Sequence, residues 1–86
     1  MEIILNEALA EQFMDSLKAE ERARATIEKY TRDVKGFLHF AGEGAILTKE
    51  TVVSYKQHLS EKYAIASANS MLAALNAFLR FLGRAD

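Results

Sequence analysis

Basic side chains concentrate in one stretch of this 86-residue chain, and their chemistry is that of phosphate neutralisation. Between residues 22 and 35 there are five basic residues against two acidic ones, a net charge of +3. If this stretch is helical at about 100° per residue, Lys29 and Arg32 project away from its apolar side. Such cations can neutralise the phosphates of a nucleic acid, and the alternative is an ordinary solvated helix face. The basic residues are Arg22, Arg24, Lys29, Arg32 and Lys35.

A second stretch, residues 66–84, carries two arginines and no acid. Exposed helix faces usually mix acidic and basic residues, whereas here the face opposite the apolar stripe holds small, amide and arginine side chains. Asn and Arg are the side chains that pair with adenine and guanine edges in a major groove. A protein partner could use the same small surface, so the pattern indicates a docking face more firmly than it indicates DNA. The polar residues of this face are Asn69, Asn76, Arg80 and Arg84.

Other site chemistries find little support. The chain has no cysteine, its two histidines lie apart from any ligand cluster, and no glycine-rich phosphate loop or nucleophile–base arrangement is recognisable. We therefore expect no cofactor, no metal and no enzymatic activity in this chain. The apolar runs are too short to span a membrane and the N-terminus lacks a basic signal region, which favours a cytoplasmic protein.

The elements that position these residues are helices. Apolar residues recur at spacings of three and four over residues 6–18, 25–41, 49–63 and from about 66 to 83, and no stretch alternates as a strand does. Asn6 and Thr48 are suited to cap the first and third helices. Tyr30, Tyr55 and Tyr63 fall on apolar stripes, and Gly36 inside the second helix suggests a close approach. The sequence predicts an all-α, compact four-helix bundle in one domain, residues 1–86.

Two of these helices end alike. The stretches "FLHFAG" (residues 37–42) and "FLRFLG" (residues 78–83) both place two phenylalanines around a leucine before a glycine. The spacing predicts that Phe37 and Phe78 are buried while Phe40 and Phe81 lie at the edges of the apolar stripes. Glycine suits the left-handed conformation that ends a helix.

The order of apolar and polar positions along the chain resembles that of a known domain, the N-terminal, SAM-like core-binding domain of the tyrosine recombinase, or phage integrase, family. The resemblance runs from about Leu9 to Gly83 and depends on joint order, since no single match is diagnostic. One departure is the start of the second helix, where the family often has Ser and this chain has Ala23 or Ala25, so we expect no side-chain cap there. The matching positions are Thr26, Tyr30, Asp33, Val34, Phe37, Tyr55, Leu59, Ser67, Asn69, Leu75, Phe78, Phe81 and Leu82.

The resemblance implies a role as one jaw of a DNA clamp. In the family, the second and fourth helices cross the major groove while a separate C-terminal domain cleaves DNA; we expect the chain to be a fragment of a longer integrase without that domain. The implied partners are double-stranded DNA at a recombination core site and other integrase protomers, contacted through the acidic first helix. The isolated fragment is expected to be monomeric.

On this hypothesis Lys29, Arg32, Lys35 and Arg84 contact phosphates, while Asn69, Asn76 and Arg80 contact bases or sugars. Replacing Lys29 or Arg80 by Ala is then expected to weaken DNA binding without unfolding the domain. The alternative is a helical protein–protein interaction module without nucleic-acid binding, which would explain the net charge of −1 equally well.

Overall fold

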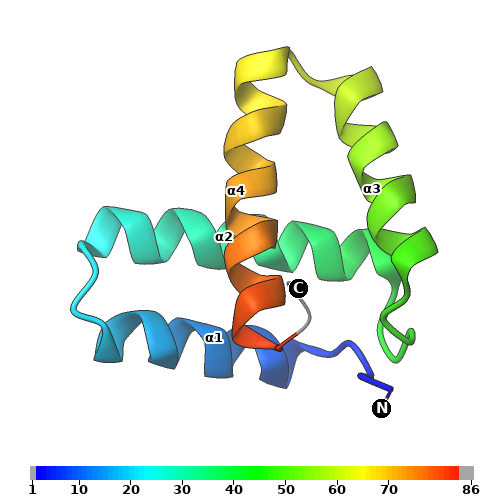
Figure 1. Cartoon of the computed structure of the whole chain (residues 1–86). Coiled ribbons are helices and arrows are strands. Elements are labelled where there is room, and N and C mark those ends of the chain that lie inside the picture. The colour runs from blue at the N-terminus through cyan, green and yellow to red at the C-terminus, as the bar shows by residue number, and fades with distance from the viewer. Residues whose placement is uncertain (1, 84–86) are drawn as a thin grey trace.

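Two helical hairpins packed crosswise make up the computed structural model, which describes residues 2–83 (Figure 1). The first hairpin is α1 (Glu7–Ala19) and α2 (Arg24–Ala41), and the second is α3 (Lys49–Lys62) and α4 (Ile65–Phe81). Within the described residues the only β pairing is an isolated bridge between Ile4 and Ile46. The predicted all-α fold with four helices is confirmed.

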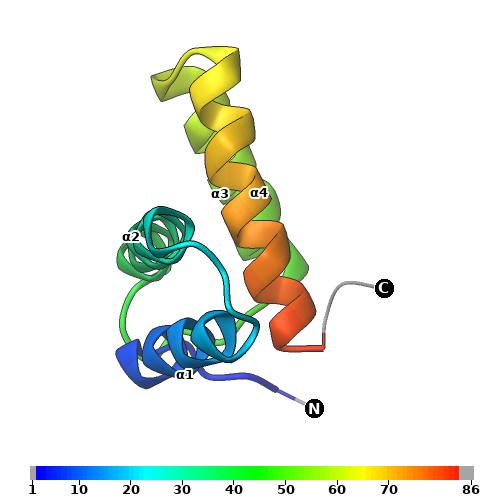
Figure 2. The same cartoon turned by 90° about the vertical axis from the view of Figure 1, so that its left-hand side faces the viewer.

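The crossing places α4 against α2. In Figure 1 α4 passes in front of α2, and Figure 2, turned by 90°, shows α1 and α2 nearly end-on beside the long α3–α4 pair. Contacts join α1 to α2, α2 to α3 and α4, and α3 to α4. The two helices that carry the predicted docking residues, α2 and α4, are therefore neighbours in space.

Helix starts follow the local sequence. The Asn6 side chain accepts a hydrogen bond from the Leu9 amide at 3.1 Å, and Thr48 Oγ1 accepts one from the Thr51 amide at 3.1 Å, so both predicted caps are confirmed. At the start of α2, Ala23 provides no side-chain cap, as expected. The start of α4 at Ala64 also has no side-chain cap.

The turn from α1 to α2 is tight. The Arg22 amide donates to the Leu17 carbonyl and the Glu21 amide to the Lys18 carbonyl, which is the bonding pattern of a Schellman motif. The residue in the left-handed position is Glu21, with a φ of 58°, where glycine is usual. This turn brings α2 back antiparallel to α1.

The core takes one aromatic ring from each of the two similar helix ends. Phe37 and Phe78 are fully buried, whereas Phe40 and Phe81 are 39% and 37% exposed, as predicted. Phe78 packs edge-on against Phe13 of α1, with 5.4 Å between ring centres. The shared sequence pattern therefore reflects two helix ends with the same packing role.

Two side chains differ from the sequence-based expectation. Tyr63, predicted on the apolar stripe of the third helix, is 38% exposed because α3 has already ended at Lys62 and Tyr63 adopts an extended backbone. Thr31, which no stripe included, is buried on α2. No helix in the described part of the chain is long and apolar enough to cross a membrane.

Candidate nucleic-acid interface

The exposed face of α4 has the composition that the sequence predicted. Asn69, Ala73, Asn76 and Arg80 are exposed, while Ala68, Ala74, Leu75 and Phe78 are buried on the opposite side. No carboxylate lies anywhere on α4. This face offers amide and guanidinium groups with no negative side chain of its own helix beside them.

On α2 the predicted basic residues have different surroundings. The side chains of Arg32 and Lys35 are exposed and form no hydrogen bond or ion pair with any described residue. Arg24 is 92% exposed and pairs loosely with Glu28, 3.5 Å away and one turn along the helix. An ion pair this exposed contributes little, so the Arg24 guanidinium remains accessible to another anion.

Lys29 is the exception, and its placement on the outward face is corrected by the structure. Its ammonium donates to the Asp33 carboxylate at 2.5 Å and to the backbone carbonyl of Ser70 on α4 at 2.9 Å. The Asp33 side chain is only 9% exposed and that of Lys29 is 32% exposed. Lys29 thus ties α2 to α4, so its charge is largely engaged within the protein.

Where α2 crosses the first half of α4, a shallow hollow of about 300 Å³ brings separate predictions together. Lys29, Arg32 and Asp33 of α2 line it, as do Ser67, Ser70 and Met71 of α4 and Tyr63, which follows α3. Ser67 and Ser70 supply hydroxyl groups beside the free Arg32 guanidinium. Cationic and hydroxyl donors of this kind suit a phosphate oxygen.

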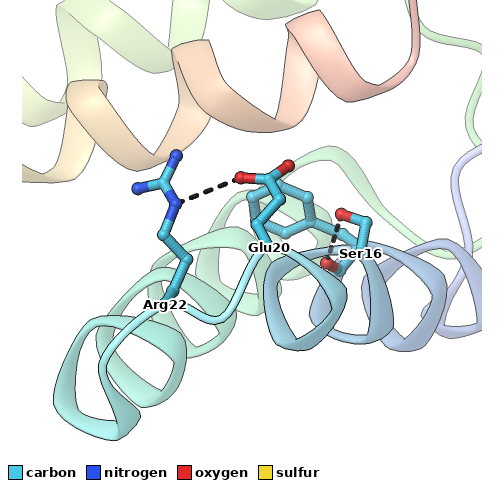
Figure 3. A network of polar contacts seen from close by, with 4 residues as sticks. Ser16, Glu20 and Arg22 are labelled. Carbon is cyan, nitrogen blue, oxygen red and sulfur yellow. Dashed lines mark hydrogen bonds and ion pairs between the residues drawn. The ribbon is translucent and has the colours of Figure 1, made fainter.

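A second hollow, of about 250 Å³, lies between the end of α1 and the second half of α4. Arg22 and Arg80, 58 residues apart in the sequence, both line it. Figure 3 shows Arg22 paired with Glu20 on the side of the turn that faces α4. Glu20 also lines this hollow, a position that the sequence pattern did not indicate, because helical periodicity does not extend into a turn.

Not every predicted site residue joins this surface. Lys35 lines hollows on the α1 side of α2, one of them with Glu7 and Glu43, and it lines neither hollow shared with α4. Arg84 lies outside the described residues. Among residues 2–83 no group of three or more acidic or histidine side chains is arranged to hold a metal ion.

Tyr55 of α3 is buried against Phe37 of α2, with ring centres 5.0 Å apart. Burial raises the pKa of the Tyr55 phenol above its ordinary value of 10.0, and the charges of Asp33 and Tyr63 raise it further. A Cβ added to Gly36 would lie 3.8 Å from the Tyr55 hydroxyl, an ordinary contact distance. Gly36 is exposed and no described atom approaches closely enough to require glycine there, so the predicted close approach is not observed.

A comparison with protein families matches residues 10–86 to the phage integrase N-terminal SAM-like domain. The chain belongs to this family. Comparisons with curated proteins and with solved structures gave no match. Together with the four-helix fold, the family assignment confirms the resemblance noted from the order of the apolar positions.

Proposed function

We propose that this integrase domain binds double-stranded DNA and clamps the major groove during recombination. The observation that carries the proposal is the α2–α4 crossing, which sets the acid-free face of α4 beside arginines that precede or belong to α2. Arg32 flanks the first half of α4 and Arg22 flanks its second half. A helix that presents amides and arginines between flanking cations suits a groove bordered by two phosphate backbones.

The roles divide by chemistry. Arg22, Arg24 and Arg32 supply sequence-independent phosphate contacts, which account for much of the affinity of DNA-binding proteins. Asn69 and Asn76 project from the exposed face of α4 and are suited to base edges or sugars, whereas Arg80, which shares a hollow with Arg22, is suited to a phosphate. The small side chain of Ala73 lies exposed on the same face and permits close approach.

In this proposal the domain acts without catalysing strand cleavage, which belongs to a separate domain of the recombinase. Residues 2–21, which include α1, contain six acidic residues and one basic residue. Such a surface repels phosphate, so it suits contact with another integrase protomer better than contact with DNA.

A chemical-shift titration tests the proposal. The ¹⁵N-labelled domain is titrated with a short duplex at about 50 mM and about 200 mM salt, a range over which phosphate contacts weaken strongly. We expect shifts around Arg32 and along Asn69–Arg80 that diminish at the higher salt. Arg80→Ala should weaken binding, whereas Glu61→Gln on the far end of α3 should not. Absence of shifts at millimolar duplex even at the lower salt concentration would contradict the proposal.

A helical protein-interaction module is the second candidate, and the tip of the α3–α4 hairpin favours it. Ile65 is 80% exposed and the adjoining Tyr63 is 38% exposed. An apolar contact there would tolerate salt, whereas phosphate contacts would not. Binding to a protein partner that persists at high salt, without any DNA-induced shifts, would support this second function.

A further inference from the structure

The hollow between the end of α1 and the second half of α4 has a charged rim and an apolar floor. Phe13 is 2% exposed and Phe81 is partly exposed; their ring centres lie 5.6 Å apart. Arg22 and Arg80 stand at the rim. Apolar walls exclude water on one side, which strengthens the attraction between an arginine and an anion held at the rim.

The two arginines differ in their partners. The Nε of Arg22 donates to a carboxylate oxygen of Glu20 at 3.1 Å (Figure 3). The Arg80 side chain forms no hydrogen bond or ion pair with any residue between 2 and 83. The hollow thus contains two guanidinium groups and one carboxylate, a net positive charge. A phosphodiester fits this charge, and guanidinium forks bind phosphate oxygens in pairs.

The Schellman turn explains why Glu20 meets Arg22. Residues two apart on a helix point to different faces, so such a pair would not form within α1. Between them Glu21 adopts a φ of 58°, which turns the chain and brings both neighbouring side chains to the side facing α4. The carboxylate is therefore held by the turn at the place where an external anion would bind Arg22.

We propose that Arg22 and Arg80 together receive one DNA phosphate and that Glu20 competes with this phosphate for Arg22. The inference rests on the proposed DNA-binding function and adds an internal competitor to it. In the free domain the Glu20 carboxylate occupies Arg22; on binding, the phosphodiester displaces it. The side chains of Arg22 and Glu20 are 44% and 55% exposed, so their pair is weak enough to exchange.

The test compares Glu20→Gln with Glu61→Gln, which removes the same charge from the distant end of α3 (Figure 1). Affinity for a fluorescent duplex is measured by anisotropy at about 100 mM salt. We expect Glu20→Gln to bind the duplex about two- to fivefold more tightly than wild type, because an exposed ion pair such as Glu20–Arg22 contributes a free energy of about this size. Glu61→Gln should gain less than about 1.5-fold, because α3 ends at the opposite end of the α3–α4 hairpin from the hollow that holds Arg22 and Arg80.

A third variant, Arg22→Ala, separates competition from general repulsion. If Glu20 acts through Arg22, Glu20→Gln should give no gain when added to Arg22→Ala. Three results would each overturn the inference while leaving DNA binding established. They are equal gains in affinity from Glu20→Gln and Glu61→Gln, a gain from Glu20→Gln that persists without Arg22, and weaker binding by Glu20→Gln than by wild type. If neither wild type nor Glu20→Gln binds the duplex at any salt, the proposed function itself fails. Thermal melting checks that each variant is folded; the backbone hydrogen bonds that close the turn are retained in Glu20→Gln.

Discussion

Replacing Lys29 by Met should destabilise the domain, contrary to the expectation from the sequence that this lysine is dispensable for folding. Methionine retains the unbranched apolar stem but removes the ammonium. The Asp33 carboxylate, on a side chain only 9% exposed, would then lose its cationic partner, and the Ser70 carbonyl would lose a donor from α2. A carboxylate with little access to water and no counter-charge is costly in the folded state.

The magnitude lies between two limits. Exposed ion pairs are worth about 0.2–1 kcal/mol, whereas removing one partner of a buried pair costs about 3–5 kcal/mol. Since Asp33 is nearly buried and Lys29 is 32% exposed, we expect a loss of about 2 kcal/mol in the free energy of unfolding. For a domain of this size that corresponds to a fall in melting temperature of about 8–16 °C.

Thermal and urea unfolding, followed by circular dichroism, measure the loss. Lys35→Met is the matched control, because it removes the same charge from an exposed position of α2 without a partner among residues 2–83, and it should change stability by less than about 0.5 kcal/mol. Asp33→Asn added to Lys29→Met should restore part of the loss, since the unpaired charge is then gone. If Lys29→Met is as stable as Lys35→Met but binds DNA more weakly, the tie between α2 and α4 is unimportant and Lys29 acts as a phosphate contact.

Three further outcomes follow from the backbone and the core. Gly36→Ala should stabilise α2 by about 1 kcal/mol, because the new methyl group meets the Tyr55 hydroxyl only at ordinary contact distance; lower stability in urea unfolding would mean that α3 cannot accommodate it. Glu21→Gly should also raise the unfolding free energy by about 1 kcal/mol, by relieving the left-handed conformation, and an unchanged melting temperature would contradict this. Because the pKa of Tyr55 is raised in the folded state, the unfolded chain releases this proton first, and stability should fall as pH rises above 10.0. Phenolate absorbance should show a late-ionising tyrosine in wild type that is missing in Tyr55→Phe.

Much of the fold is local and was predictable. Asn6 and Thr48 cap their helices with their own side chains, and the three- and four-residue spacing of apolar positions marks the inner face of each helix. The repeated Phe-Leu-x-Phe-x-Gly pattern indicated which ring of each pair is buried. These features depend on interactions within a few residues, which is why a single sequence carries them.

Errors occurred where the outcome depended on another element. A helical wheel describes angles about one axis, so it placed Lys29 opposite the apolar face of α2 without knowing that α4 crosses there. The Ser70 carbonyl that accepts its hydrogen bond lies 41 residues further along the chain. Tyr63 was assigned to the core because the periodicity extended one residue beyond the actual end of α3.

The sequence by itself determined the helical class, the helix caps, the acid-free composition of α4 and the order of apolar positions that marks the integrase family. Only the tertiary structure decided which charges act together. A hydrogen bond from Lys29 to the Ser70 carbonyl joins α2 to α4. Arg22 and Arg80 line one hollow, together with Glu20. The physical reason is that helix periodicity repeats over a few residues, whereas the angle at which two hairpins cross is set by packing between side chains distant in sequence.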